Sequence, residues 1–188
     1  MFPKRTYVIA MAAALGATLS APLAVADNFR SEPRTAAQIE IAEQLDGFES
    51  AAAALQKQMD HYAASLRSNK PHLQSHSYNL RYAKEQVNYL GRELNTLEQL
   101  GPQGTKLQQM AIREARPHLQ AVADHVQSAI VMLNEDQRSH WTPDFREKVK
   151  GIYEHADSLY TEVDAITDYE EADLRAVEMN ALAESDDV

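Results

Sequence analysis

The residues of this chain that could do chemistry are its histidines. Seven of the 188 residues are histidine and none is cysteine. The lack of cysteine excludes thiol catalysis, thiolate zinc sites, iron–sulfur clusters and covalent c-type haem, whereas imidazole remains a ligand for metals and for b-type haem. In an antiparallel helical bundle, His61, His76, His125 and His155 would lie roughly 8 to 20 Å from one end, one on each helix. Met59 falls at the same level.

The position of each histidine in the helical repeat argues against a metal or b-type haem site. His76 lies on the apolar seam of its helix, His125 and His155 flank their seams, and His61 is on an outer face. No Glu or Asp stands three residues before any histidine, so the Glu-x-x-His pairs of di-iron bundles are missing. The weak metal-ligand candidates are His76, His125 and His155. For His76 we favour a buried residue that is hydrogen-bonded to a neighbour and fixes helix register. We therefore expect no metal and no cofactor.

The sequence carries no pattern of catalytic groups. It has no Gly-rich phosphate loop and no G-x-S-x-G elbow. Paired acids such as Glu170-Glu171 fall on a polar C-terminal stretch, where nothing would desolvate them into general acids or bases. We predict that the protein is not an enzyme.

Four stretches place apolar residues at spacings that alternate three and four, the heptad seam of packed helices. The clearest seam is Leu73, His76, Leu80, Ala83, Val87, Leu90, Leu94 and Leu97. The expected helices cover about 35–68, 71–100, 105–133 and 142–169. Their short connections predict an all-α, antiparallel up-down-up-down four-helix bundle. The alternative is one or two long hairpins that dimerise into a similar bundle.

Local signals mark where these helices begin and bend. Thr35 with Gln38, and Thr105 with Gln108, have the spacing of capping boxes, and Thr142-Pro143-Asp144 is a typical helix start. Residues 134–141 are expected to form a polar connection. Pro117 predicts a kink within one continuous helix. Gly91, in a helix interior, predicts close contact with a neighbouring helix, because glycine there is otherwise unfavourable.

Residues 1–26 have the pattern of a cleaved signal peptide. Lys4 and Arg5 precede an uncharged apolar run, and Ala24-Val25-Ala26 is a small-x-small cleavage site. Residues 27–34 then form an irregular leader, 35–169 the bundle and 170–188 an acidic, partly helical extension. No later segment is apolar enough to span a membrane. The expected location is outside the cytoplasm, first the periplasm and second the medium.

The charge balance of the chain is strongly acidic. Without residues 1–26, which hold two basic and no acidic residues, the formal net charge is −12. Such a surface repels phosphate backbones, so nucleic-acid binding is not expected. Residues 169–188 contain seven acids against Arg175 alone. An acidic end of this kind usually serves only to keep the chain solvated, and the alternative is a docking strip for a basic partner or for weakly held cations.

Part of the chain resembles a group of uncharacterised exported bacterial four-helix-bundle proteins. The likeness covers about residues 75–169 and rests on the run His76-x3-Leu80-x6-Val87-Asn88-x2-Gly91-x2-Leu94-x2-Leu97-Glu98, then Ala111-Ile112, Pro117, Leu119 and Leu133-Asn134. The resemblance implies the fold but no activity. Separately, Thr142-Pro143-Asp144 is similar to a turn of Spy-type periplasmic stress chaperones, from which Trp141 and Arg146 depart.

Three functions stay open at this point. The first is a non-enzymatic exported protein that acts through self-association or contact with an unknown envelope protein. The second is a periplasmic bundle that binds a metal or b-type haem through some of its histidines. The third is a holdase-type stress chaperone. The strong seams and the absence of catalytic patterns favour the first.

Overall fold

The computed structural model describes residues 34–67 and 72–185, which fold as four helices within one compact unit. They are α1 (Ala36–Arg67), α2 (Leu73–Leu100), α3 (Lys106–Glu135) and α4 (Pro143–Ser185), with short 3-10 helices η1 (Gly101–Gln103) and η2 (Gln137–Trp141). The described residues contain no strand. The expected signal peptide and most of the expected leader lie outside these residues. None of the described helices is both long and apolar enough to cross a bilayer.

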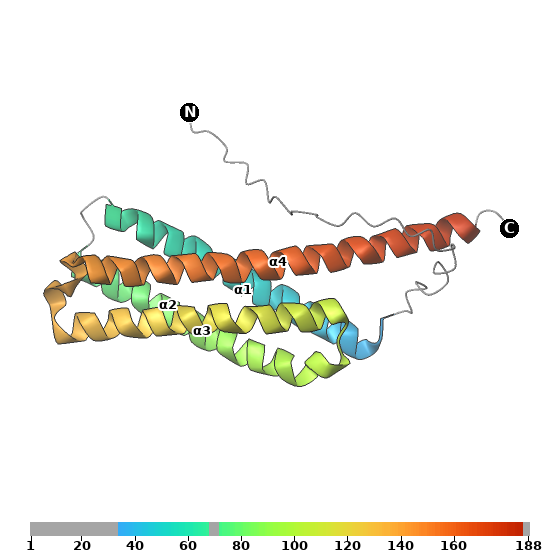
Figure 1. Ribbon diagram of the computed structural model, residues 1–188, viewed down its shortest axis with the longest axis horizontal. Coiled ribbons are helices and arrows are strands. Elements are labelled where there is room, and N and C mark those ends of the chain that lie inside the picture. The colour runs from blue at the N-terminus through green and yellow to red at the C-terminus, as the bar shows by residue number, and fades with distance from the viewer. Residues whose placement is uncertain (1–33, 68–71, 186–188) are drawn as a thin grey trace, which may run out of the picture. The chain divides into compact units, whose positions relative to one another are not determined.

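The helices form an antiparallel up-down-up-down bundle (Figure 1), which confirms the predicted fold. α1 packs on α2 and α4, and α3 packs on the same two helices. Polar contacts between α1 and α4 fix their opposite directions. Thr167 Oγ1 donates to Glu49 Oε2 at 2.7 Å, and Gln56 Nε2 donates to Asp157 Oδ1 at 3.0 Å. The partner number on α4 falls as the number on α1 rises, as antiparallel packing requires.

The predicted seams form the core of the bundle. Phe48, Leu97, Val122 and Ile152 are examples, with at most 1 % of their surface exposed. Burial of such apolar surface is the main stabilising contribution to a domain that has no disulfide. Only a few seam residues, Val87 among them, remain partly exposed at the edge of the core.

The predicted helix starts are confirmed. Thr35 and Gln38 exchange backbone–side-chain hydrogen bonds at 2.9 and 3.2 Å, and Thr105 and Gln108 do so at 3.0 and 3.1 Å. Thr142 Oγ1 accepts from the amide of the third residue of α4 at 3.2 Å. The buried Gln108 side chain also donates to the Gln38 carbonyl at 2.9 Å. This bond joins the first turns of α1 and α3, which lie at the same end of the bundle.

One connecting segment differs from expectation. Residues 134–141 are not a simple polar connection, since α3 continues to Glu135 and residues 137–141 form η2. The Asp136 side chain accepts from the Arg138 amide at 2.9 Å, which caps η2 and explains why this segment folds. α3 runs through Pro117 as a single helix, as expected.

The prediction that Gly91 marks a close helix contact is wrong. A Cβ built at Gly91 would have no neighbouring atom within 4 Å. Glycine at position 91 therefore destabilises the helix, and no close packing contact compensates for this cost.

Replacing Gly91 with Ala is expected to raise the free energy of unfolding by about 0.5–1 kcal/mol, because alanine restricts the unfolded chain and strains nothing here. Urea unfolding followed by circular dichroism measures this change. A destabilised Gly91→Ala variant would show that the open space beside α2 is occupied in solution.

Candidate functional site

His76 lies at the meeting point of four segments of the bundle. Its side chain is fully buried, and its Nδ1 is 2.8 Å from the Tyr62 hydroxyl of α1, with which it shares a hydrogen bond. The Phe145 ring of α4 meets the imidazole edge-on at a centroid distance of 5.3 Å, and the His140 ring of η2 lies at 5.0 Å. The hydrogen bond expected for a buried His76 is present. Its role in fixing register stays a prediction.

Tyr62 is suited to this bond because it is itself buried, with 1 % of its surface exposed. Burial raises the pKa of the Tyr62 phenol far above its usual value, so the hydroxyl keeps its proton at neutral pH. The pair is therefore a polar contact inside an apolar core. Met59, one turn earlier on α1, is fully buried core and adds no polar group.

A second histidine cluster lies between α3 and α4. The His155 ring of α4 is 5.5 Å from that of His125 and 5.9 Å from that of His118, both on α3. Glu162 Oε2 lies 3.0 Å from His118 Nε2 and completes a row of four side chains. The sequence carried a signal for this row, because the two α3 histidines are seven residues apart, as are His155 and Glu162. We call these four residues the histidine row.

Gly151 of α4 makes room for one end of the histidine row. A Cβ at this position would lie 2.6 Å from both Cε1 and Nε2 of His125. Side-chain atoms do not approach that closely, so the ring occupies space that only glycine leaves free. The sequence showed a glycine inside a helix but did not show which side chain it receives.

Burial lowers the pKa of His125, and the charges of Lys148 and His155 lower it further. Asp124 and Glu147 act in the opposite direction but do not reverse the shift. The neutral form of the His125 imidazole is therefore favoured at this position.

Stability is expected to fall as the pH is lowered from about 7.5 to 5.5, because the unfolded chain, with an ordinary histidine pKa of about 6.5, binds a proton more readily than folded His125 does. The contribution of His125 is complete above the unfolded pKa and is lost as the pH falls through the folded pKa. The Tm measured across this range should fall less in His125→Gln than in the parent. Equal slopes would show that His125 titrates normally.

The structure divides the metal-ligand candidates between two places. His125 and His155 are neighbours in the histidine row, whereas the ring neighbours of His76 are Tyr62, His140 and Phe145. No ring contact among the described residues joins these two groups. His61 is exposed and its Nδ1 lies 2.7 Å from the Lys57 carbonyl. No three His, Asp or Glu side chains of the described residues are arranged to hold a metal ion. The four-helix ligand set considered above is therefore not assembled.

Comparison with known proteins gives no further guide to the role of these clusters. No protein-family model, curated protein or solved structure matches the chain. The family resemblance noted above stays a prediction.

The C-terminal part of α4 has no buried side chain among those described after Glu170. Glu170 is buried at the end of the bundle, where Thr105 Oγ1 donates to it at 2.7 Å and Arg34 lies at 3.3 Å. Beyond Glu170, α4 continues to Ser185 and runs past the first turns of α1 and α3 (Figure 1). Met179 on this part is 68 % exposed. We call residues 171–185 the α4 extension.

Proposed function

We propose that this protein is a non-enzymatic, exported helical bundle that acts in the periplasm through contacts with proteins, including copies of itself, and that the α4 extension is its main contact element. The observation that carries the proposal is the 15-residue continuation of α4 beyond Glu170 with a large apolar side chain facing solvent. The signal-like N-terminal sequence supports export.

The exposed surface of the α4 extension favours binding to another protein. The extension continues a helix that is already nucleated, but most helical stability in proteins comes from packing one face. The extension has Glu171, Asp173 and Glu178 exposed around it, and Met179 adds a flexible apolar side chain of the kind found at adaptable protein contacts. A bound protein surface would add packing to the exposed Met179 side chain.

The buried polar groups support a role without catalysis. His76 is bonded to Tyr62, and Glu170 accepts from Thr105 and pairs with Arg34. Both clusters tie one helix to another inside the bundle. A catalytic acid or base would instead need to reach a bound substrate.

Photocrosslinking from the α4 extension tests this function. A photoreactive amino acid at position 179 in the protein expressed in its own host is expected to give protein adducts. The control position is Tyr78, which is 56 % exposed on α2 and should give few. If position 179 yields no protein adduct, or no more than position 78, the proposal fails.

A further inference from the structure

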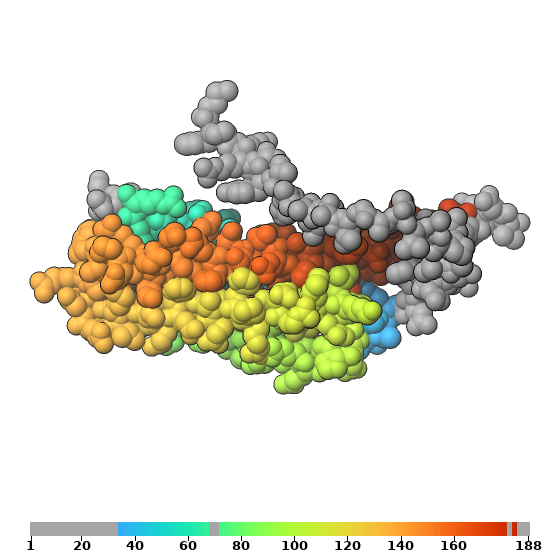
Figure 2. All heavy atoms as spheres, viewed as in Figure 1, coloured from blue at the N-terminus to red at the C-terminus, as the bar shows by residue number. Residues whose placement is uncertain are grey.

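A groove between α1 and α4 lies toward the end of the bundle opposite the α4 extension. It has a volume of about 660 Å³ and is bounded by the last turns of α1 and the first turns of α4. Figure 2 shows these two segments, in teal and orange, side by side. The lining residues are Ala63, Leu66, Arg67, Arg146, Lys150, Tyr153 and Glu154.

The groove combines cations with apolar walls in an otherwise acidic protein. The lining holds Arg67, Arg146 and Lys150 against Glu154, which Lys150 contacts at 3.0 Å. The carboxylates of Asp60 and Asp157 also lie close enough to act on Tyr153. Arg146 donates to the Trp141 carbonyl at 3.1 Å, and among the described residues neither arginine forms an ion pair with a carboxylate. The lining itself therefore gathers three cations in a chain of net charge −10. Such a site attracts an acidic segment that carries some apolar surface.

We propose that this groove receives the α4 extension of a second copy of the chain, so that the protein associates head to tail. This inference rests on the proposed function and names the partner of the extension. The inference depends on charge complementarity between the groove and the extension. Residues 171–185 hold Glu171, Asp173, Glu178 and Glu184 against a single Arg175, and they place Met179 beside Glu178. The Met179 side chain would pack on the walls formed by Ala63 and Leu66, while Glu178 meets the arginines.

The same molecule cannot supply both halves of this contact. Lys150 and Glu178 lie on one continuous helix, 28 residues apart, which corresponds to roughly 42 Å. The extension therefore reaches a groove only in another copy. Because the two contact surfaces differ, the association is heterologous and generates open chains or closed rings of molecules rather than a two-fold dimer.

Charge reversal with reciprocal rescue tests the contact. Arg146→Glu places a carboxylate in the groove where Glu178 would meet an arginine, and Glu178→Arg places a cation at that point of the extension. Each variant alone is expected to weaken self-association roughly tenfold or more, as measured by sedimentation velocity, because like charges then meet across the contact. An equimolar mixture of the two variants should recover association, since positions 146 and 178 then carry opposite charges in every contact between unlike copies. Raising the salt concentration should weaken association of the parent.

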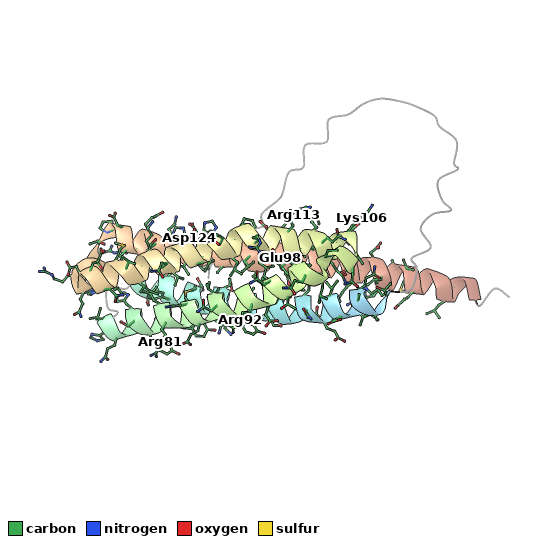
Figure 3. All side chains as sticks on the ribbon, turned by 90° about the horizontal axis from the view of Figure 1, so that it is seen from below. Arg81, Arg92, Glu98, Lys106, Arg113 and Asp124 are labelled. Carbon is green, nitrogen blue, oxygen red and sulfur yellow. The ribbon has the colours of Figure 1, made fainter. Side chains whose placement is uncertain are left out.

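Arg92→Glu is the matched control, because Arg92 is exposed on α2 and its side chain points outward from the bundle (Figure 3). It changes the net charge as Arg146→Glu does and should leave association unchanged. Circular dichroism melts establish that each variant is folded.

A parent that stays monomeric up to the highest soluble concentration overturns the head-to-tail contact. Association that neither reversal affects, or variants that do not rescue each other, also overturns it. If dodecanoate binds the parent but not Arg146→Glu while no association is found, the groove takes a small anionic amphiphile instead. Adducts from position 179 that contain only other proteins would refute this contact yet leave the proposed function standing.

Discussion

Replacing Tyr62 with Phe is expected to lower the free energy of unfolding by about 1–3 kcal/mol, although the ring keeps its shape. The substitution removes the hydroxyl that lies 2.8 Å from Nδ1 of the fully buried His76. That nitrogen then loses its bond to Tyr62 in a place that water does not easily reach. Thermal unfolding should show a decrease in Tm of roughly 3–12 °C for a bundle of this size.

A second substitution separates the hydrogen bond from the packing around it. In a His76→Leu background, Tyr62→Phe should cost much less, because removing both polar partners leaves no buried group without its bond. Tyr78→Phe is the matched control, since Tyr78 is 56 % exposed on α2 and should tolerate the change. If Tyr62→Phe melts with the parent protein, the bond to His76 contributes nothing to stability.

The fold was predictable because one repeated signal specifies it. The seam residues of all four helices alternate by three and four, and side chains with that spacing can be buried together only when helices pack lengthwise. Thr35, Thr105 and Thr142 mark helix starts through contacts within a few residues. Information of this local kind is fully present in the sequence.

Contacts between residues far apart in the sequence were harder to predict. The seam placed His76 in the core, but its neighbour His140 comes from η2, a segment expected to be only a polar connection. Glu170 occupies a seam position, where an acid normally interrupts the apolar pattern. Its burial depends on the hydrogen bond from Thr105, 65 residues away. Partners of this kind follow from the rotation and offset of helices, which the heptad pattern fixes only approximately.

Two of the helical glycines show the same limit. In the sequence, Gly91 and Gly151 are each simply a glycine inside a predicted helix. In the structure, Gly91 faces open space and Gly151 makes room for the His125 ring. Which one has a packing role depends on what the neighbouring helix presents at that level. The histidine row likewise needed the offset between α3 and α4, which brings His155 between His118 and His125.

Replacing Gly151 with Ala is expected to destabilise the protein by up to about 2 kcal/mol, because overpacking of about 1–3 kcal/mol exceeds the gain of about 1 kcal/mol in helix propensity. The new methyl group would lie 2.6 Å from two atoms of the His125 ring, which must leave its place beside His155. Chemical denaturation measures the loss, and the imidazole resonances of His125 and His155 should shift as the rings separate.

The sign of the effect should reverse when the ring is absent. In a His125→Ala background, Gly151→Ala removes a helical glycine and meets no imidazole, so it is expected to stabilise by about 1 kcal/mol, as Gly91→Ala does in the parent. The double-mutant cycle then gives a coupling energy of about 1–3 kcal/mol between positions 125 and 151. A coupling energy near zero would mean that His125 moves aside at no cost. The packing of Gly151 would then not hold the histidine row together, and the ring contacts of His155 would have to position it instead.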